Sequence, residues 1–309
     1  MRNTAPPFSA LAQHEVFAVD ERSAQLLVRS ATDSVVIRFG DRSVSAPTTR
    51  GVAVVELDDL SPDTNFTATL HDEHTSLGEL QFRTRPSIGP ILSRFATISD
   101  VHLGAESFSG ARSLVDPCYA DPYALRCARS AVSELSAWGA ELLVVKGDLT
   151  DTGRTSDWEL AEVLFGDVDL PVIFSPGNHD VWKTRDLEPA EGSARIGIEI
   201  KDVLVRDLDG VRVVLVDTTR ASRGTGDLAR SKDAILEAID TAQPVFLALH
   251  HNIQRAPVTW FWPAGISSAN ARPVVSALSS VNPRIFVSSG HTHRNRRHTL
   301  AGGITYTEV

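Results

Sequence analysis

Short apolar runs organise the second part of the sequence, and nearly every run ends in a polar cluster rich in Asp, His and Asn. Apolar side chains at consecutive positions are typical of strands in a sheet that is covered on both faces. Helical patterns fill the intervals between the runs, which predicts an α/β fold. The helix that contains Pro273 is expected to be interrupted or capped there, because proline has no backbone N–H to donate. The runs lie at residues 94–99, 142–145, 171–174, 211–216, 244–249 and 284–287, and helices are expected at 122–139, 156–165, 228–240 and 269–278.

The first part of the sequence has another pattern, with short alternating runs separated by turn clusters such as Gly40–Ser43. Regular spacing of short strands and turns predicts a small all-β sandwich. The stretch from Leu57 to Phe66 resembles a segment of fibronectin type III domains, and residues 86–90 have the composition of a linker. We therefore expect a fibronectin type III-like domain over residues 1–88 and a second domain over 89–309. Its strands are expected at residues 24–29, 34–39, 51–57, 65–70 and 79–84.

Composition excludes several classes of protein. Of 309 residues, 42% are hydrophobic and 22% are charged, which is ordinary globular usage. Acidic residues outnumber basic ones 39 to 30, and a net charge of −9 argues against a nucleic-acid backbone as the partner. The sequence has no stretch of the roughly 20 apolar residues that cross a bilayer and no signal-peptide core, so a cytoplasmic protein is the expectation. Cys118 and Cys127 are expected to be thiols, and the oligomeric state is left open.

The polar clusters are expected to meet in space. Ligands of an open α/β sheet bind beyond the carboxyl ends of its strands, so clusters that follow successive strands converge on one crevice. Glycine before Asp148, Asn178 and His291 lets the backbone turn tightly and approach its neighbours closely. The clusters are Asp100-Val101-His102, Gly147-Asp148-Leu149-Thr150-Asp151, Gly177-Asn178-His179-Asp180, His250-His251 and Gly290-His291-Thr292-His293.

These residue types suit a metal centre. Carboxylate, imidazole and amide ligands without thiolate favour Mn, Fe, Zn or Co. The ligands are too many for one tetrahedral site, so two divalent or mixed-valence metal ions that share a bridging carboxylate are the economical interpretation. Two metal ions about 3.5–4 Å apart are a known arrangement for in-line displacement at phosphorus.

The ordered set of motifs over residues 94–294 resembles the signature of the calcineurin-like metallophosphoesterases. This resemblance implies a β-sheet sandwich flanked by helices and a dinuclear metal centre. It implies that Asp100, His102 and His293 hold one metal, that Asn178, His250 and His291 hold the other, and that Asp148 bridges them. His179 would be the catalytic histidine beside the scissile phosphoester, and it would not bind a metal. Asp151 and Asp180 would orient ligands, and His251 would be a neighbour of the ligands.

Within this family, Asp151 resembles the branch of class III cyclic-nucleotide phosphodiesterases and broad-specificity bacterial phosphodiesterases, since purple acid phosphatases carry Tyr at that place. Two departures concern the surroundings of the site. The branch commonly has His-His-Pro-Pro where this sequence has His250-His251-Asn252-Ile253. The sequence also ends at Val309, soon after the last pair of histidines, whereas family members usually continue with further strands.

Two groups of residues are candidates for substrate contact. Arg294, with Arg296 and Arg297, follows the last ligand pair and is either a solvated face or a cationic rim that steers an anionic phosphoester. Trp260 and Trp262 lie in the loop after His250, where they are either core or a rim that stacks on a base.

The function expected from these residues is hydrolysis of a small-molecule phosphodiester, such as a cyclic nucleotide, by a metal-bridging hydroxide. Two alternatives stay open. A phosphomonoesterase or nucleotidase would use the same metal centre, and a binding scaffold would keep the fold without the reaction.

Overall fold

The computed structural model describes residues 14–108, 112–115, 118–166, 168–182, 184–258 and 263–309. Trp260 and Trp262 lie outside the described residues. The chain divides into two compact units, Met1–Pro90 and Ile91–Val309. Among the described helices, none has the length and apolar character needed to cross a membrane. Cys118 and Cys127 are both exposed thiols.

The first unit is a sandwich of two antiparallel sheets, with strand orders β1-β2-β5 and β4-β3-β6-β7. Alternate residues of each strand face the core between the sheets, where Leu26, Ile37 and Val55 are fully or almost fully buried. This all-β arrangement fits a fibronectin type III-like domain. The strands are β1 (His14–Val19), β2 (Ala24–Arg29), β3 (Ser34–Phe39), β4 (Arg42–Pro47), β5 (Val52–Leu57), β6 (Asn65–His71) and β7 (Ser76–Arg83).

Strands β2, β3, β5, β6 and β7 confirm the runs predicted from sequence, but β1 and β4 were not predicted. The turn expected over Gly40–Ser43 is shorter than predicted, because β4 already begins at Arg42. β4 is an edge strand in which only Ala46 is buried, so its sequence lacks the alternation of polarity that marked the other strands.

The second unit contains two larger sheets. The first is parallel, with the order β12-β11-β8, and the second has the order β13-β14-β15-β16-β18-β17. The strands are β8 (Phe95–Ile98), β11 (Leu142–Lys146), β12 (Val172–Ser175), β13 (Val203–Leu208), β14 (Val211–Val216), β15 (Val245–Leu249), β16 (Ile285–Ser289), β17 (Arg296–Thr299) and β18 (Thr305–Glu308), and a two-stranded ribbon is formed by β9 (Ser107–Phe108) and β10 (Arg112–Ser113).

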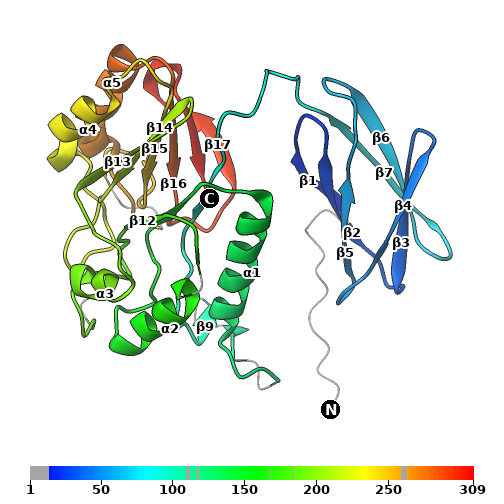
Figure 1. Cartoon of the computed structure of the whole chain (residues 1–309), viewed down its shortest axis with the longest axis horizontal. Helices are drawn as coiled ribbons and strands as arrows, with labels where there is room; N and C mark the ends of the chain where they lie inside the picture. Colours follow the sequence, from blue (N-terminus) through cyan, green and yellow to red (C-terminus); the bar gives the residue numbers. More distant parts are fainter. Residues whose placement is uncertain (1–13, 109–111, 116–117, 167, 183, 259–262) are drawn as a thin grey trace. The chain divides into compact units, whose positions relative to one another are not determined.

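The two larger sheets pack face to face, and helices cover their outer faces. Val144 of β11 and Leu215 of β14 belong to one apolar cluster between the sheets. Their neighbours Leu143 and Val214 point the opposite way, into clusters that include the helices. Because both faces are apolar, the strands are apolar at consecutive positions, as the sequence indicates. This is the predicted β-sheet sandwich flanked by helices (Figure 1).

Four of the helices match the predicted ranges with one correction, and α3 was not predicted. α5 was expected to be interrupted or capped near Pro273, and that was wrong, because the helix runs through Pro273 to Val281. Burial of Val274, Val275 and Leu278 against the six-stranded sheet compensates for the backbone hydrogen bond that proline cannot make. The helices are α1 (Tyr123–Trp138), α2 (Thr155–Phe165), α3 (Pro189–Arg195), α4 (Lys232–Ile239) and α5 (Ser268–Val281), with short 3₁₀ turns at Ala229–Ser231 and Ala301–Gly303.

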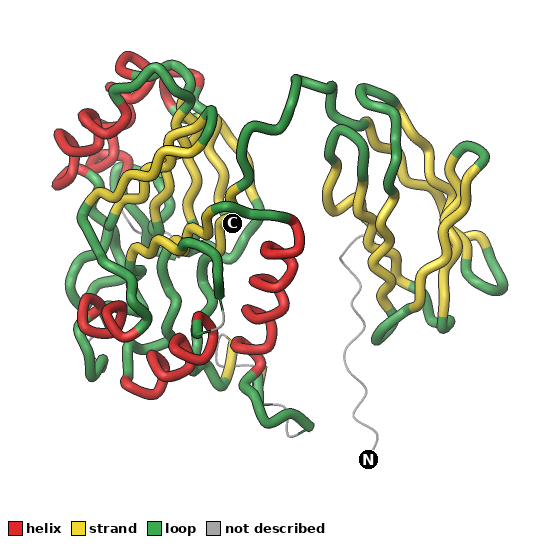
Figure 2. The backbone as a smooth tube through the Cα atoms, viewed as in Figure 1, coloured by secondary structure: helices red, strands yellow, loops and turns green. Residues whose placement is uncertain are grey.

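Much of the second unit is loop, as the green tube in Figure 2 shows. Long loops follow β8, β12 and β15, and each of these loops begins at a predicted polar cluster. The loops after β8 and β12 start at the same edge of one parallel sheet, and the loop after β15 meets them from the other sheet, because His250 contacts Asn178.

Candidate metal centre

The five polar clusters predicted from the sequence meet at the carboxyl ends of the strands. β8 leads to Asp100 and His102, β11 leads to Asp148, and β12 leads to Asn178. From the other sheet, β15 leads to His250, and β16 leads to the pair His291 and His293. Both sheets therefore contribute side chains to one centre.

Asp100, His102 and His293 form the first group of this centre. Nε2 of His293 lies 3.3 Å from Oδ1 of Asp100 and 3.3 Å from Nε2 of His102. Two imidazole nitrogens at this distance repel each other unless a proton or a cation lies between them. The arrangement suits a cation, and these three side chains have ligand atoms within 4.8 Å of one another.

Asp148 lies between the first group and a second one. Its Oδ2 is 3.8 Å from Nε2 of His102 and 3.3 Å from Nε2 of His250. The same nitrogen of His250 is 3.1 Å from Oδ1 of Asn178. The rings of His250 and His291 lie 5.1 Å apart in an edge-on arrangement. The carboxylate of Asp148 thus faces both groups at once.

Hydrogen bonds fix which ring nitrogens face the centre. Nδ1 of His102 donates to Asp151 Oδ1 at 3.2 Å, and Nδ1 of His250 donates to the carbonyl oxygen of Lys146 at 2.9 Å. Nε2 of His291 donates to the carbonyl oxygen of Ala264 at 3.2 Å. Histidines that bind metals usually donate their second ring N–H in this way, to a carboxylate or a carbonyl group. The residues therefore fit a metal centre by their hydrogen bonding as well as by their type.

The backbone is strained at most of these residues. Asp100, His102, Asp148, His291 and His293 all have a positive φ, between 49° and 72°. Only Asp, Asn and His, besides Gly, adopt this conformation with any frequency, and it persists where the surrounding structure determines it. Such residues gather at active sites and ligand clamps, and this strain was not predicted from the sequence.

Two glycines are required by close approach to these side chains. A Cβ atom on Gly177 would lie 2.2 Å from Oδ1 of Asp148, and one on Gly147 would lie 2.6 Å from Nδ1 of His250. Gly147 also has a φ of +87°, which disfavours any residue with a side chain. The glycines before the polar residues therefore make room for the neighbouring ligand side chains.

His179 borders the centre on the side of the first group. Its backbone N–H donates to Asp148 Oδ1 at 2.8 Å, and its Nδ1 donates to the carbonyl oxygen of Asp151 at 2.7 Å. Its ring packs edge-on against His102 and stacks on Trp182. Burial alone would lower the pKa of His179, but Asp151 and Asp148 raise it to about 9. The imidazole is therefore a cation at neutral pH in the metal-free protein.

Asp151 and Asp180 hold parts of the centre in place. Asp151 contacts His102, and hydrogen bonds from His102 and His179 outweigh burial and lower the pKa of its carboxyl group. Asp180 is fully buried and accepts hydrogen bonds from the backbone N–H groups of Gly177 and Thr150 at 2.8 Å. Burial and the charge of Asp148 raise the pKa of Asp180. Asp180 thereby connects the loop after β12 to the loop after β11.

His251 lies directly beside the second group. It is fully buried, and a ligand atom of its ring lies within 4.8 Å of those of His250 and His291. Its Nδ1 bonds with the Thr218 hydroxyl at 2.8 Å, whereas Nε2 has no hydrogen-bond partner among the described residues. Burial lowers the pKa of His251 well below its usual range, so the ring is neutral.

The two histidines of the second group, His250 and His291, have pKa values shifted in opposite directions. Burial would lower the pKa of His250, but the charge of Asp148 raises it to about 9. Burial and the charge of His250 lower the pKa of His291 to about 4. The charges of the histidines outweigh burial at Asp148, whose pKa is well below its usual range. One imidazole of the group is thus charged and the other is neutral.

Lys146 is the residue at the centre that sequence reasoning missed. Its side chain is fully buried between the sheets, and Nζ donates to the Ser288 hydroxyl at 2.9 Å. Burial lowers the pKa of Lys146 to about 8. Its carbonyl oxygen also accepts the hydrogen bond from His250. The sequence feature that could have indicated this buried lysine is its position at the end of an apolar run.

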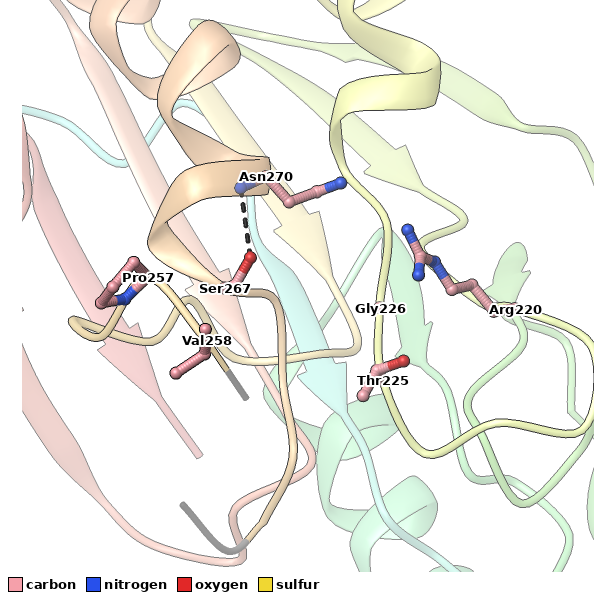
Figure 3. A pocket seen from close by; sticks show the side chains of 7 residues that line it. All are labelled: Arg220, Thr225, Gly226, Pro257, Val258, Ser267 and Asn270. Atoms are coloured by element: carbon pink, nitrogen blue, oxygen red, sulfur yellow. Dashed lines mark hydrogen bonds between the residues drawn. The ribbon is translucent and has the colours of Figure 1, made fainter. Parts of the chain in front are cut away.

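Of the candidate substrate-binding residues, the structure describes Arg294 but not the two tryptophans. Arg294 is exposed beside His293, and Trp260 and Trp262 fall outside the described residues. A small cavity of about 340 Å³ lies between Arg220 and Thr225 on one side and Val258 and Ser267 on the other (Figure 3). The positive charge of Arg220 in this cavity is already neutralised, because its guanidinium group pairs with Asp227 at 2.9 Å.

Known proteins with sequence similarity point to phosphoester chemistry. The model of the calcineurin-like phosphoesterase family matches residues 93–295. A protein described as a probable cyclic nucleotide phosphodiesterase, from Vesicomyosocius okutanii subsp. Calyptogena okutanii (strain HA), is 21% identical over 169 residues. That match covers 54% of this chain and 68% of the relative.

One solved structure shows similarity of fold, and a second aligns over a smaller share of this chain. The purple acid phosphatase PPD1 from yellow lupin (Lupinus luteus) seeds aligns with a TM-score of 0.50 at 13% identity, over 96% of this chain and 63% of its own. The chain thus spans less than two thirds of the lupin protein. A dimetal phosphatase from Danio rerio aligns with a TM-score of 0.49 at 17% identity, over 70% of this chain and 87% of its own.

The family match spans the whole centre, from Asp100 at the end of β8 to His293 after β16. It also covers the two sheets and the helices that position these side chains, apart from the last two strands, β17 and β18. The chain therefore belongs to the calcineurin-like phosphoesterase family.

Proposed function

We propose that this protein hydrolyses small phosphodiesters, cyclic nucleotides among them, with the help of two divalent cations from the set Mn, Fe, Zn and Co. The observation that carries the proposal is the position of Asp148. Its carboxylate faces His102 at 3.8 Å and His250 at 3.3 Å, so it can serve two cations at the same time. A pair of cations joined by one carboxylate is suited to displacement at phosphorus.

The ligands divide between the two cations by their contacts. The three residues of the first group, together with Asp148, would hold one cation. Asn178, His250 and His291 would hold the other, again with Asp148. When bound, two such ions supply a water of lowered pKa as the nucleophile and offset charge on the phosphoryl oxygens.

His179 would protonate the leaving group. It is held by hydrogen bonds to Asp148 and Asp151 at the edge of the centre, and, against the effect of burial, these two carboxylates raise its pKa in the metal-free protein. An alkoxide is a poor leaving group, so a proton from a positioned acid lowers the barrier to its departure. The charged imidazole would also stabilise the negative charge that develops on the phosphoryl oxygens.

A diester is preferred over a monoester for two reasons. The relative from Vesicomyosocius okutanii is described as a probable cyclic nucleotide phosphodiesterase. In addition, Asp151 stands where purple acid phosphatases carry Tyr, and it contacts His102 and His179. A role as a phosphomonoesterase or as a binding scaffold would use the same residues and is distinguished by experiment.

The test compares two chromogenic substrates on metal-free protein reconstituted with Mn²⁺. We expect faster turnover of bis-p-nitrophenyl phosphate than of p-nitrophenyl phosphate, with two Mn²⁺ bound per chain. Faster turnover of the monoester would replace the diesterase by a phosphomonoesterase. Two bound Mn²⁺ without turnover of either compound, or of 3′,5′-cyclic AMP, would leave the scaffold as the correct interpretation.

A further inference from the structure

A cavity of about 800 Å³ opens beside the metal centre, larger than the cavity of Figure 3. The loop after β15 forms one wall through Asn252 and Arg255, and the edge strand β17 with its neighbour β18 forms the other. Thr292, which stands between His291 and His293, also lines the cavity. Among the described residues, none of the proposed metal ligands lines the cavity, but Thr292 and Arg294 are the chain neighbours of His293, so the cavity adjoins the metal centre.

The walls carry an excess of positive charge. Arg255, Arg294, Arg296 and Arg297 all line the cavity and are all exposed. Within the described part of the chain, none of the four takes part in an ion pair within 4.0 Å, whereas Arg220 beside the smaller cavity is paired with Asp227. Guanidinium groups that gather around one cavity without carboxylate partners are suited to an anionic ligand.

Strand register places part of this charge on one face. In the β17–β18 pair, Arg296 lies opposite Glu308 and His298 lies opposite Tyr306. Directly opposite residues of an antiparallel pair project from the same face of the sheet. Nε2 of His298 is 3.6 Å from Oε1 of Glu308, which is 5% exposed, so a buried carboxylate holds His298 in the wall. This wall of the cavity is thus built from paired positions of β17 and β18.

Unpartnered polar atoms lie where the cavity meets the metal centre. Thr292 and Asn252 are each 7% exposed. In the part of the chain that the structure describes, neither the Thr292 hydroxyl nor Oδ1 of Asn252 has a hydrogen-bond partner. Oδ1 of Asn252 is directed at Gly265, where a Cβ atom would lie 2.1 Å from it, and both unpartnered oxygens are closed to solvent. Binding of a ligand in the cavity therefore depends on the arginines and not on these two atoms.

We propose that this cavity is a subsite for a second phosphate group of the substrate, carried on the sugar of the diester. The inference rests on the proposed phosphodiesterase function and adds the substrate class to it. The reacting phosphodiester has one negative charge, which two cations and His179 would already offset. The cavity itself has four arginines and one carboxylate, Glu308, so an excess of positive charge is left for a further anion. A carboxylate would balance only one of the arginines, whereas a terminal phosphate is dianionic and matches the planar guanidinium group. The cavity has the volume of an ordinary small-molecule site.

The test uses two substrates that differ in one group. Thymidine 5′-(p-nitrophenyl phosphate) and its 3′-phosphorylated form both release p-nitrophenolate, so the bond that breaks is the same. We expect the 3′-phosphate to raise kcat/KM of the Mn²⁺-loaded protein about tenfold, the effect of about 1.4 kcal/mol of binding. In the double variant Arg294→Gln/Arg296→Gln, the ratio should fall to about one.

A matched control lies at the opposite edge of the same sheet. Arg206 of β13 is exposed and lies far from the cavity in the strand order, so Arg206→Gln should leave the ratio unchanged. Turnover of bis-p-nitrophenyl phosphate, which has no second phosphate, should be the same in Arg206→Gln and in the wild-type protein. Any general loss of steering in the double variant should lower kcat/KM of both thymidine substrates alike, so the ratio reports the subsite. An equal kcat/KM for the two thymidine substrates in the wild-type protein would overturn the subsite while leaving the phosphodiesterase intact.

Binding provides a readout that does not depend on turnover. Calorimetry of the Mn²⁺-loaded protein should show tighter binding of thymidine 3′,5′-bisphosphate than of thymidine 5′-monophosphate by about tenfold. The difference should disappear in the double variant. If the wild-type protein binds both nucleotides equally, the subsite is wrong whatever the activity. If it discriminates between them yet hydrolyses no diester, the proposed function fails and the subsite stands.

Discussion

Nε2 of His250 lies 3.3 Å from Oδ2 of Asp148, and neither side chain has appreciable contact with solvent. The charge of Asp148 outweighs burial and raises the pKa of His250 from 6.5 to about 9. A proton therefore occupies the metal-free pair at neutral pH, at the place where a cation would bind. Protons and metal ions compete for the same atoms.

This competition predicts a pH-dependent metal affinity. Below pH 9 the proton on His250 must leave before a cation binds, so the Kd for Mn²⁺ should fall by about tenfold per unit between pH 7 and pH 9. Calorimetry in buffers of different ionisation enthalpy should count about one proton released. A Kd that is constant over this range would contradict the shared site.

The same shift affects the stability of the metal-free protein. The pKa of His250 is higher in the folded protein than its value of 6.5 in an unfolded chain. Its contribution is fully present below pH 6.5 and is lost as the pH rises through about 9. Thermal unfolding of the metal-free His250→Gln variant should lack this part of the pH dependence.

Replacement of Asp148 should disable the whole centre. Asp148→Asn keeps the shape of the side chain but removes the charge that faces both groups. We expect loss of at least one bound Mn²⁺ and a fall in kcat/KM on the order of 10³-fold, because both cations depend on this carboxylate. Metal content and diesterase rate are measured on the same sample. Asp207→Asn, which breaks a surface pair with Arg212, is the control and should retain both.

His179 should affect chemistry without affecting metal binding. In His179→Asn, we expect kcat for a diester with an alkoxide leaving group to fall by about 10²–10⁴. The loss should be much smaller for p-nitrophenolate, which leaves without a proton. Two Mn²⁺ should remain bound. An equal loss for both leaving groups would assign His179 to substrate binding in place of proton transfer.

Gly177 should tolerate no side chain. The Cβ of Gly177→Ala would lie 2.2 Å from Oδ1 of Asp148 and 2.8 Å from Cε1 of His250, so the ligands must move apart. We expect weaker Mn²⁺ binding and a destabilisation of about 1–3 kcal/mol. Gly224→Ala is a matched control, because a Cβ there meets nothing within 4 Å. Equal metal affinity in the two variants would contradict the close approach.

Pro273 should be a site of gain in stability. Pro273→Ala restores the backbone donor inside α5, and the smaller unfolded-state entropy of proline offsets part of this gain. We expect a net stabilisation of about 1–2 kcal/mol in denaturant unfolding of the second unit. Pro189 stands at the beginning of α3, where proline is favourable, so Pro189→Ala should bring no gain.

Much of the centre could be predicted because ligand type and strand order are local features of the sequence. Asp100 and His291 lie 191 positions apart and follow strands of different sheets, yet each stands at the carboxyl end of an apolar strand, and these ends of the two packed sheets meet at the centre. The backbone N–H of His291 indeed donates to Asp100.

Other features depended on packing that no local pattern contains. The continuation of α5 past Pro273 comes from its buried face, and the position of Lys146 comes from the facing sheet. The ring orientation of His291 depends on the carbonyl oxygen of Ala264, a residue whose own side chain carries no chemical signal.

The left-handed backbone at the centre bears on how this site could change in evolution. At Asp100, His102, Asp148, His291 and His293, the chain geometry itself favours Asp, Asn, His or Gly over other residues. A descendant that lost its metals would still be selected to keep small polar residues or glycine there, to avoid unfolding. Asn178 and His250 have no positive φ. Replacement of Asn178 or His250 by other residue types would add less backbone strain. These two positions would therefore be the first to change after catalysis was lost.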